Sequence, residues 1–217
     1  MSLPPATQRP QPRCAPPAGS PKYTAILETA EAMFGAHGFR KASVEEIAAQ
    51  AGVSKPLIYR YFRSKKHLFE VVVDRVIDEW CDVIAAEGAR ATPSAAHSLR
   101  LIVRASLEFA RSRDVLRGLL ARESQLMLAG YSDVLDRGTD TLRRVVAEAL
   151  ERGVRGGDVR TDLDLDNMAG VITEVCVRFG ERLLAGDMNA GQTELLEAIV
   201  ETLLHGVIVH REANGPT

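Results

Sequence analysis

The sequence has few cysteines and no long apolar run, and each of these absences argues against a particular class of protein. Its three cysteines are far apart in the 217 residues and form no CxxC pair, which argues against a disulfide framework or a zinc site. No stretch of about 18 uncharged apolar residues occurs, and the N-terminus lacks the basic start and apolar run of a secretory signal. We therefore expect a cytoplasmic protein with no membrane partner and no cofactor.

The sequence also lacks the signatures of an enzyme. It has no nucleophile–base pair, no phosphate-binding loop and no metal-ligand spacing that we can identify. The acidic run at residues 158–166 invites a metal interpretation, but it lacks the glycine and the terminal glutamate of an EF-hand loop. Carboxylates just before a helix are already explained by capping and by the helix dipole, so we favour a cap there.

The charge is unevenly divided along the chain. The net charge is only −2, yet residues 1–66 carry ten lysines and arginines against four acids, a balance of +6. The remaining residues have 17 basic side chains against 25 acidic ones, a balance of −8. A basic segment joined to an acidic body indicates that one end meets a polyanion.

The organisation of the chain is an N-terminal arm followed by helices. Residues 1–21 hold seven of the ten prolines and almost no large apolar side chain, which predicts a disordered arm. Apolar residues then recur at helical spacing, and Gly35 and Gly38 are expected to end the first helix. The apolar face of that helix consists of Ile26, Leu27, Ala30, Met33 and Phe34. Alternating β-branched runs are missing, so the predicted fold class is all-α.

Two short helices joined by a tight turn are predicted at residues 43–63. Ser43 begins a capping box, in which its hydroxyl accepts a hydrogen bond from the Glu46 amide. Gly52 follows at a position where a turn needs a positive φ, and Ser54 caps the next helix. Small Ala48, with Gly52 four residues later and Ile58 six further, matches the helix-turn-helix spacing.

The second of these helices, residues 55–63, has one apolar and one basic face. Ile58, Tyr61 and Phe62 turn inward at spacings of three and four. The other face combines cations with tyrosine, and we expect both Tyr59 and Tyr61 to be exposed among those cations. Ser64 caps a third helix, whose first turn places Lys65 and Lys66 against the helix dipole. A bound phosphate would offset the electrostatic cost of placing these lysines there. The alternative interpretation of residues 43–63 is an ordinary helical hairpin with a solvated basic face.

Residues 34–39, 43–47 and 52–65 closely resemble the TetR family of tetracycline-repressor-like regulators. The resemblance covers about residues 23–70 and its motif is specific, whereas the rest of the chain resembles the family only in helical character and length. It implies a helix-turn-helix DNA-binding domain at 22–68 and a helical effector-binding and dimerisation domain at 69–217. We expect a regulator, most simply a repressor, that binds a palindromic DNA operator as a homodimer and is released by a small lipophilic effector. The alternative is an architectural or division-linked DNA-binding protein without an effector.

The resemblance also implies roles for single residues. Ser43, Tyr61 and Lys65 would contact phosphates, and Lys55, Pro56 and Tyr59 would face the major groove. Two positions depart from the family: Arg60 replaces a common aromatic residue and is predicted to read guanine, and Leu57 replaces a small hydroxyl residue and could meet a thymine methyl. The full set of expected DNA-binding residues is Ser43, Ser54, Lys55, Pro56, Leu57, Tyr59, Arg60, Tyr61, Lys65 and Lys66. Cations of the arm reach an adjacent minor groove or belong to a solvated tail.

Dimerisation is expected through the last two long helices, each of which carries an apolar stripe. With the same two helices of a partner they would form a four-helix bundle; the alternative is that the stripes form a thick core within a monomer. The expected interface residues are Met168, Val171, Val175, Leu196, Ile199, Val200, Leu203 and Val207.

The helices at about 74–184 would surround the effector. The expected lining residues are Trp80, Phe109, Met127, Leu128, Tyr131, Val175 and Phe179.

Overall fold

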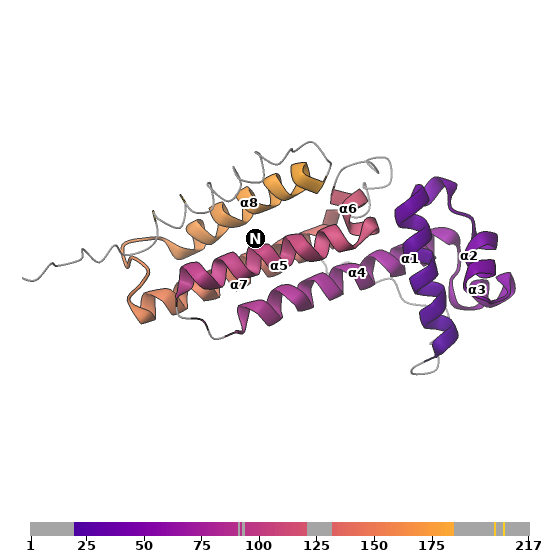
Figure 1. Cartoon of the computed structure of the whole chain (residues 1–217), viewed down its shortest axis with the longest axis horizontal. Helices are drawn as coiled ribbons and strands as arrows, with labels where there is room; N and C mark the ends of the chain where they lie inside the picture. Colours follow the sequence, from indigo (N-terminus) through magenta and orange to yellow (C-terminus); the bar gives the residue numbers. More distant parts are fainter. Residues whose placement is uncertain are drawn as a thin grey trace, which may run out of the picture. The chain divides into compact units, whose positions relative to one another are not determined.

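The computed structural model describes residues 20–90, 92, 94–120, 132–184, 202 and 206. Over these residues the chain forms eight α-helices and no β-strand, so the predicted all-α fold is confirmed (Figure 1). Within the described part, none of the helices has the length and apolar character needed to cross a bilayer. The helices are α1 (Pro21–Lys41), α2 (Val44–Gln50), α3 (Lys55–Tyr61), α4 (Lys65–Gly88), α5 (Ala95–Ser112), α6 (Asp114–Leu120), α7 (Ser132–Gly156) and α8 (Leu165–Leu184).

The chain divides into two compact units. Unit 1 comprises residues 1–80 and 110–137, and unit 2 comprises residues 81–109 and 138–217. Unit 1 therefore contains α1, α2, α3, α6 and the N-terminal part of α4, while unit 2 contains most of α5 and α7 together with α8. The helix α4 supplies residues to both units.

The first helix starts earlier than its sequence pattern predicts, and its regular geometry breaks at Gly38, where the pattern ends it. Ser20 is its N-cap and accepts a hydrogen bond from the Tyr23 amide at 3.5 Å, so Pro21, placed in the arm by prediction, is the first helical residue. The backbone leaves helical geometry at Gly38, with φ 72° and ψ 163°, and then resumes to Lys41. The predicted inward face is confirmed, since all five of its apolar residues are buried.

Close packing joins α1 to α6 at Gly35. A β-carbon built on Gly35 would lie 2.5 Å from the Cβ atom of Asp114, the first residue of α6. Real β-carbons do not approach so closely, so the two backbones can meet only because residue 35 has no side chain. Gly35 therefore sets the distance between the N-terminal module and α6.

Charged side chains reinforce the same junction. The Arg75 guanidinium donates to Glu31 Oε2 at 2.6 Å, and Arg113 Nη1 donates to Glu31 Oε1 at 3.0 Å. Arg113 also contacts Glu79, which Arg75 Nε approaches at 3.5 Å. Glu31 is only 8% exposed, so these bonds compensate a carboxylate that would otherwise be buried without partners. The network ties α1 and α4 to the residue that precedes α6.

Unit 2 has its own apolar core and its own helix caps. Gly88 lies against Val145 of α7 with no room for a β-carbon. Asp158 Oδ2 accepts from the Ala95 amide at 2.7 Å, and Asp164 Oδ1 accepts from the Asp166 amide at 3.1 Å. Asp164 therefore caps α8, the helix that follows the acidic run, as predicted, whereas the cap that Asp158 provides for α5 was not predicted. The core contains Ile84, Leu99, Ile102, Val103, Leu142, Val145, Val146, Leu150, Ala169 and Ile172.

The contact at Gly35 makes a prediction about stability. Gly35→Ala should lower the free energy of unfolding in urea by about 1–3 kcal/mol, because the added methyl group overpacks the α1–α6 junction. Gly118→Ala is the matched control, since a β-carbon there meets no atom within 4 Å. That change should stabilise α6 by about 0.5–1 kcal/mol. Equal effects of the two substitutions would contradict the close contact.

Candidate nucleic-acid interface

The turn between α2 and α3 has the geometry that its sequence predicts. Ser43 Oγ accepts from the Glu46 amide at 3.1 Å, which confirms that half of the capping box. Gly52 has φ 64°, and the next amide, that of Val53, donates to the Ala48 carbonyl at 2.9 Å. Ala48 is 4% exposed, which allows the helices to cross closely. The two helices are thus held by a short turn that only glycine adopts without strain.

Aromatic packing holds α3 against α1. Ile58 and Phe62 are fully buried, and Tyr61 is 8% exposed. The Tyr23 ring meets the Tyr61 ring edge-on at 5.3 Å between centroids and stacks on the Phe62 ring at 5.6 Å. Burial raises the pKa of the Tyr23 hydroxyl, so this ring stays neutral within the cluster. The prediction that Tyr61 points inward is confirmed, and the expectation that it is exposed among the cations is wrong.

The opposite side of α3 faces outward and is basic. Lys55, Pro56 and Arg60 are exposed, and Tyr59 is the most exposed aromatic side chain described, at 38%. Leu57 is half-buried, so less of it is available than the pattern predicts. We call the surface formed by Lys55, Pro56, Leu57, Tyr59 and Arg60 the α3 face.

Lys55 is engaged by an acid of the preceding helix. Its ammonium forms a hydrogen-bonded ion pair with Glu45 of α2 and lies 5.8 Å from the centre of the Tyr59 ring. The hydrogen bond to Glu45 raises the pKa of Lys55, and the same bond lowers the pKa of Glu45. Because both side chains are exposed, the pair contributes little stability, and a phosphate can compete for the ammonium. The sequence does not predict this partner, because Glu45 and Lys55 are ten residues apart and no local spacing pattern pairs them.

The serines at the starts of α3 and α4 differ in their roles. Ser54 occupies the N-cap of α3, but its hydroxyl makes no capping hydrogen bond, so that part of the prediction is wrong. The Ser54 carbonyl instead accepts from the Leu57 amide at 2.9 Å, and the side chain is exposed. Ser64 Oγ accepts from the His67 amide at 3.1 Å and caps α4 as predicted. His67 is buried, and its Nδ1 accepts from the Arg63 amide at 3.1 Å.

The two lysines in the first turn of α4 lie in different surroundings. Lys65 Nζ is 4.6 Å from the centre of the Phe39 ring and donates to the Arg40 carbonyl at 3.2 Å. The Phe39 ring and the Arg40 carbonyl therefore stabilise the charge of Lys65, a role that the sequence analysis assigns to a phosphate. Lys66 Nζ is 3.6 Å from Glu70 and its side chain is 68% exposed. Of the two, Lys66 is the more accessible to a polyanion.

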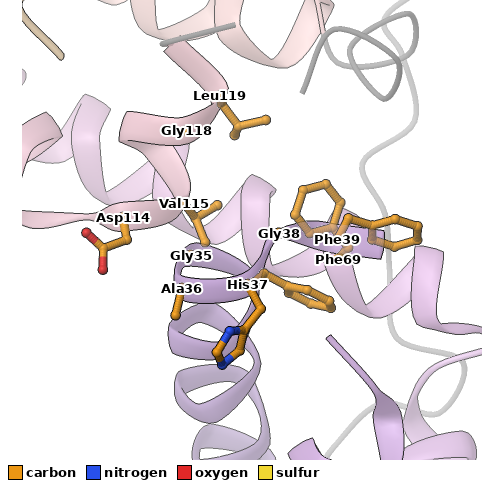
Figure 2. Close-up of a pocket in the computed structure, with 11 residues that line it drawn as sticks. Gly35, Ala36, His37, Gly38, Phe39, Phe69, Asp114, Val115, Gly118 and Leu119 are labelled. Carbon is orange, nitrogen blue, oxygen red and sulfur yellow. The ribbon is translucent and has the colours of Figure 1, made fainter. Parts of the chain in front are cut away.

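Three of the expected effector-lining residues have described side chains: Trp80, Phe109 and Val175. Trp80 is buried in unit 1, while Phe109 and Val175 are half-buried in unit 2. Met127, Leu128, Tyr131 and the side chain of Phe179 lie outside the described residues. Two cavities are seen elsewhere: one of about 240 Å³ in unit 1 (Figure 2) and one of about 480 Å³ in unit 2. None of the expected residues lines either cavity.

The expected dimer residues can be examined only on α8. Val171 is 48% exposed, more than any other large apolar side chain described, and Met168 is half-buried. Five of the expected residues lie outside the described part of the chain: Leu196, Ile199, Val200, Leu203 and Val207.

Comparisons with known proteins bear on the N-terminal module and on the whole fold. The model of the family described as "Bacterial regulatory proteins, tetR family" matches residues 26–72. The HTH-type transcriptional regulator RutR of Escherichia coli (strain K12) is 34% identical over 129 residues, which are 59% of this chain and 58% of RutR. The chain thus matches little more than half the length of that relative.

Solved structures extend the likeness in fold to most of the chain. A TetR-like transcriptional regulator from Rhodococcus sp. RHA1 is similar with a TM-score of 0.62 and 24% identity, over 89% of this chain and all of that one. The regulator FadR from Bacillus subtilis, solved in complex with stearoyl-CoA, is similar with a TM-score of 0.66 and 17% identity, over 87% of this chain and all of that one. The helix-turn-helix geometry and the family match lead to one conclusion: residues 26–72 of this chain are similar to the DNA-binding domain of the tetR family of bacterial regulatory proteins, and most of the chain shares the fold of TetR-like regulators.

Proposed function

We propose that this chain is a cytoplasmic transcriptional repressor that binds a palindromic DNA operator as a homodimer and releases it when a small lipophilic effector binds. The observation that carries the proposal is the α3 face, a basic surface on a short helix whose other side is anchored in the core. A helix presented in this way fits the major groove of duplex DNA. The relatives, which are transcriptional regulators, support the same function.

Base recognition is assigned to the α3 face. Arg60 is exposed, and its planar guanidinium can donate two hydrogen bonds to the O6 and N7 atoms of guanine. Lys55 and Tyr59, with Pro56, approach neighbouring base edges, and the accessible part of Leu57 contacts a thymine methyl. Arg60 and Leu57 are therefore the residues that we expect to distinguish this operator from those of relatives.

Phosphate contacts are assigned to the rim of this surface. Ser43 and Ser54 lie at the starts of α2 and α3, where helix dipoles favour an anion. Lys66 adds an exposed ammonium, and Lys65 can join it by leaving the Arg40 carbonyl. Because Tyr61 is buried against Tyr23, we now assign it to anchoring α3.

A homodimer is proposed because one α3 reads too few base pairs for useful specificity. The exposed Val171 on α8 supports a partner on that helix, since burying it against a second copy would remove apolar surface from water. A two-fold dimer presents two identical reading helices, which require an operator with inverted half-sites.

A lipophilic effector is proposed for the helical body. The fold resembles that of FadR from Bacillus subtilis, which was solved with stearoyl-CoA, and this supports an acyl-chain ligand class for this chain. The helix α4 includes residues of both units, so a displacement of its C-terminal part would be transmitted towards the DNA-binding module. Effector and operator must then weaken each other's binding by the same factor.

Arg60 provides the sharpest test of operator recognition. Selection of bound sequences from random duplexes should give the wild-type protein an inverted repeat, with one guanine in each half-site that depends on Arg60. Arg60→Ala should lose selection at that guanine and about 1–3 kcal/mol of operator affinity for each half-site.

Lys66→Ala is the control for this experiment. It should keep the selected sequence, weaken binding to all duplexes alike and reduce the slope of log affinity against log salt by about 1.8, because the dimer loses one phosphate contact in each half-site. If Arg60→Ala behaves in the same way as Lys66→Ala, the role in base recognition is wrong. If the wild type selects no sequence, the regulator hypothesis is wrong.

The effector is tested by operator release. The probes are stearoyl-CoA, palmitate and coenzyme A, each added to the full chain. The first two are lipophilic and should raise the melting temperature and release the selected operator. Coenzyme A, which has no acyl chain, should do neither. A lipophilic compound that stabilises the protein without changing operator affinity would contradict the coupling. If no lipophilic compound releases the operator, the alternative of an architectural DNA-binding protein is favoured.

A further inference from the structure

An acidic side chain lies beside the α3 face, and the proposed function gives it no role. Glu45, in the first turn of α2, forms a hydrogen-bonded ion pair with Lys55 of α3. The Lys55 ammonium also lies 5.8 Å from the centre of the Tyr59 ring, so the carboxylate is held among side chains that are expected to meet bases. The side chains of Glu45 and Lys55 are 61% and 46% exposed, so a ligand on this face can reach the pair.

A carboxylate in this place opposes the binding of a phosphate. If a phosphate took the Lys55 ammonium, Glu45 would be left unpaired next to a group of the same charge, and the two would repel each other. A ligand that offers hydrogen-bond acceptors and a donor together can instead bind both side chains and leave their ion pair intact. Base edges in the major groove of DNA offer this combination, whereas phosphates offer acceptors only.

The ion pair leaves hydrogen-bonding groups for such a ligand. Within the described part of the chain the ammonium gives one of its three N–H groups, to Glu45 Oε1, so two donors remain. A carboxylate has two oxygens with about four lone-pair sites, so Glu45 can accept a further bond while it holds Lys55. The same bond restricts the flexible lysine side chain before DNA arrives, which lowers the entropic cost of binding.

A G·C base pair carries the complementary pattern in the major groove. It presents the guanine N7 and O6 acceptors, followed by the N4 amino donor of cytosine. The Lys55 ammonium can donate to N7 and O6 while a Glu45 oxygen accepts from N4, which makes three hydrogen bonds without separating the charges. An A·T pair presents an acceptor, a donor and an acceptor in that order, so only two neighbouring groups can be matched. The ion pair therefore favours G·C.

The two side chains start from fixed backbone positions. Glu45 lies in the first turn of α2, and Lys55 is the first residue of α3. The turn between them is held by Gly52 at φ 64° and by the Val53 amide, which donates to the Ala48 carbonyl at 2.9 Å. Because the donor and the acceptor come from different helices, their order across the face is fixed. The guanine is then confined to one strand, so G·C is distinguished from C·G.

We propose that Glu45 and Lys55 act as one unit that reads a G·C base pair in each operator half-site, with Lys55 on guanine and Glu45 on cytosine. Since this role needs a DNA ligand, it rests on the proposed function. It adds to that function an acid that contacts a base and a second recognised base pair, separate from the guanine assigned to Arg60.

Selection of bound sequences from random duplexes by the full chain locates this base pair. The wild type should select a G·C pair in each half-site that Arg60→Ala still selects, because it depends on Glu45 and Lys55. Glu45→Ala should lose about tenfold of the preference for G·C over A·T in each half-site, since the cytosine amino group then has no acceptor. An unchanged preference in Glu45→Ala would overturn the proposal.

Glu46→Ala is the matched control. Glu46 is the neighbouring exposed acid on α2, and its removal changes the net charge by the same amount without breaking the ion pair of Glu45. It should strengthen binding to all duplexes alike and leave the preference for G·C unaltered. If Glu45→Ala does only this, Glu45 acts by repulsion alone and the proposal is wrong. Helical circular dichroism must match the wild type for each variant.

Lys55→Ala, alone and combined with Glu45→Ala, tests whether the two side chains act as one unit. Each single change should reduce the preference for G·C, and the double change should reduce it no further than the larger single effect. Losses that add would indicate two independent contacts and would overturn the proposal.

The outcomes separate this role from the proposed function. If the wild type selects no sequence, both are wrong. If it selects an inverted repeat whose base preferences are the same in Glu45→Ala, operator recognition stands and the role of Glu45 is wrong.

Discussion

The packing of Tyr61 and Phe62 against Tyr23 is the interaction on which the candidate interface depends. A helix of seven residues, such as α3, is too short to be stable alone in water. Its conformation therefore comes from the side that it buries, where Ile58 and the aromatic cluster hold it against α1. Once that side is fixed, helical geometry decides which residues point outward, and Lys55, Tyr59 and Arg60 follow.

The helix α1 connects this anchor to the rest of unit 1. Its N-terminal turn carries Tyr23, and its later turns carry Glu31 and Gly35, which contact the network of Arg113 and the start of α6. A buried ion pair and a backbone contact without room for a methyl group are both intolerant of small displacements. Movement of α6 should therefore be felt along α1.

Local signals in the sequence predicted the module well. A capping serine, a glycine at a positive φ and apolar spacings of three and four each act over a few residues, and together they located α2, the turn and α3. The start of α1 was harder to predict, because Pro21 belongs to a proline-rich segment and is nevertheless the first helical residue after the Ser20 cap. The exposure of Tyr61 was misjudged because its partner, Tyr23, lies on another helix.

Contacts between distant residues could not be predicted in this way. Arg113 meets Glu31 across 82 positions, and no local pattern marks either residue as a partner of the other. The pairing of Lys55 with Glu45 depends on the crossing of α2 and α3, which sequence spacing describes only coarsely. The cavity beside Gly118 is a property of packing, since a glycine in a helix can equally mark a close contact, as Gly35 does. An effector pocket is similarly beyond the reach of single-residue preferences.

The central claim is that DNA is read by the α3 face of an anchored helix. Mapping amide chemical shifts of the full chain during titration with its selected operator tests this claim most directly. The largest changes should fall on Lys55, Tyr59, Arg60 and the flanking starts of α2 and α4, with the Ile58 and Phe62 amides changing less. Shifts concentrated outside residues 43–66, with the α3 face unaffected, would contradict it.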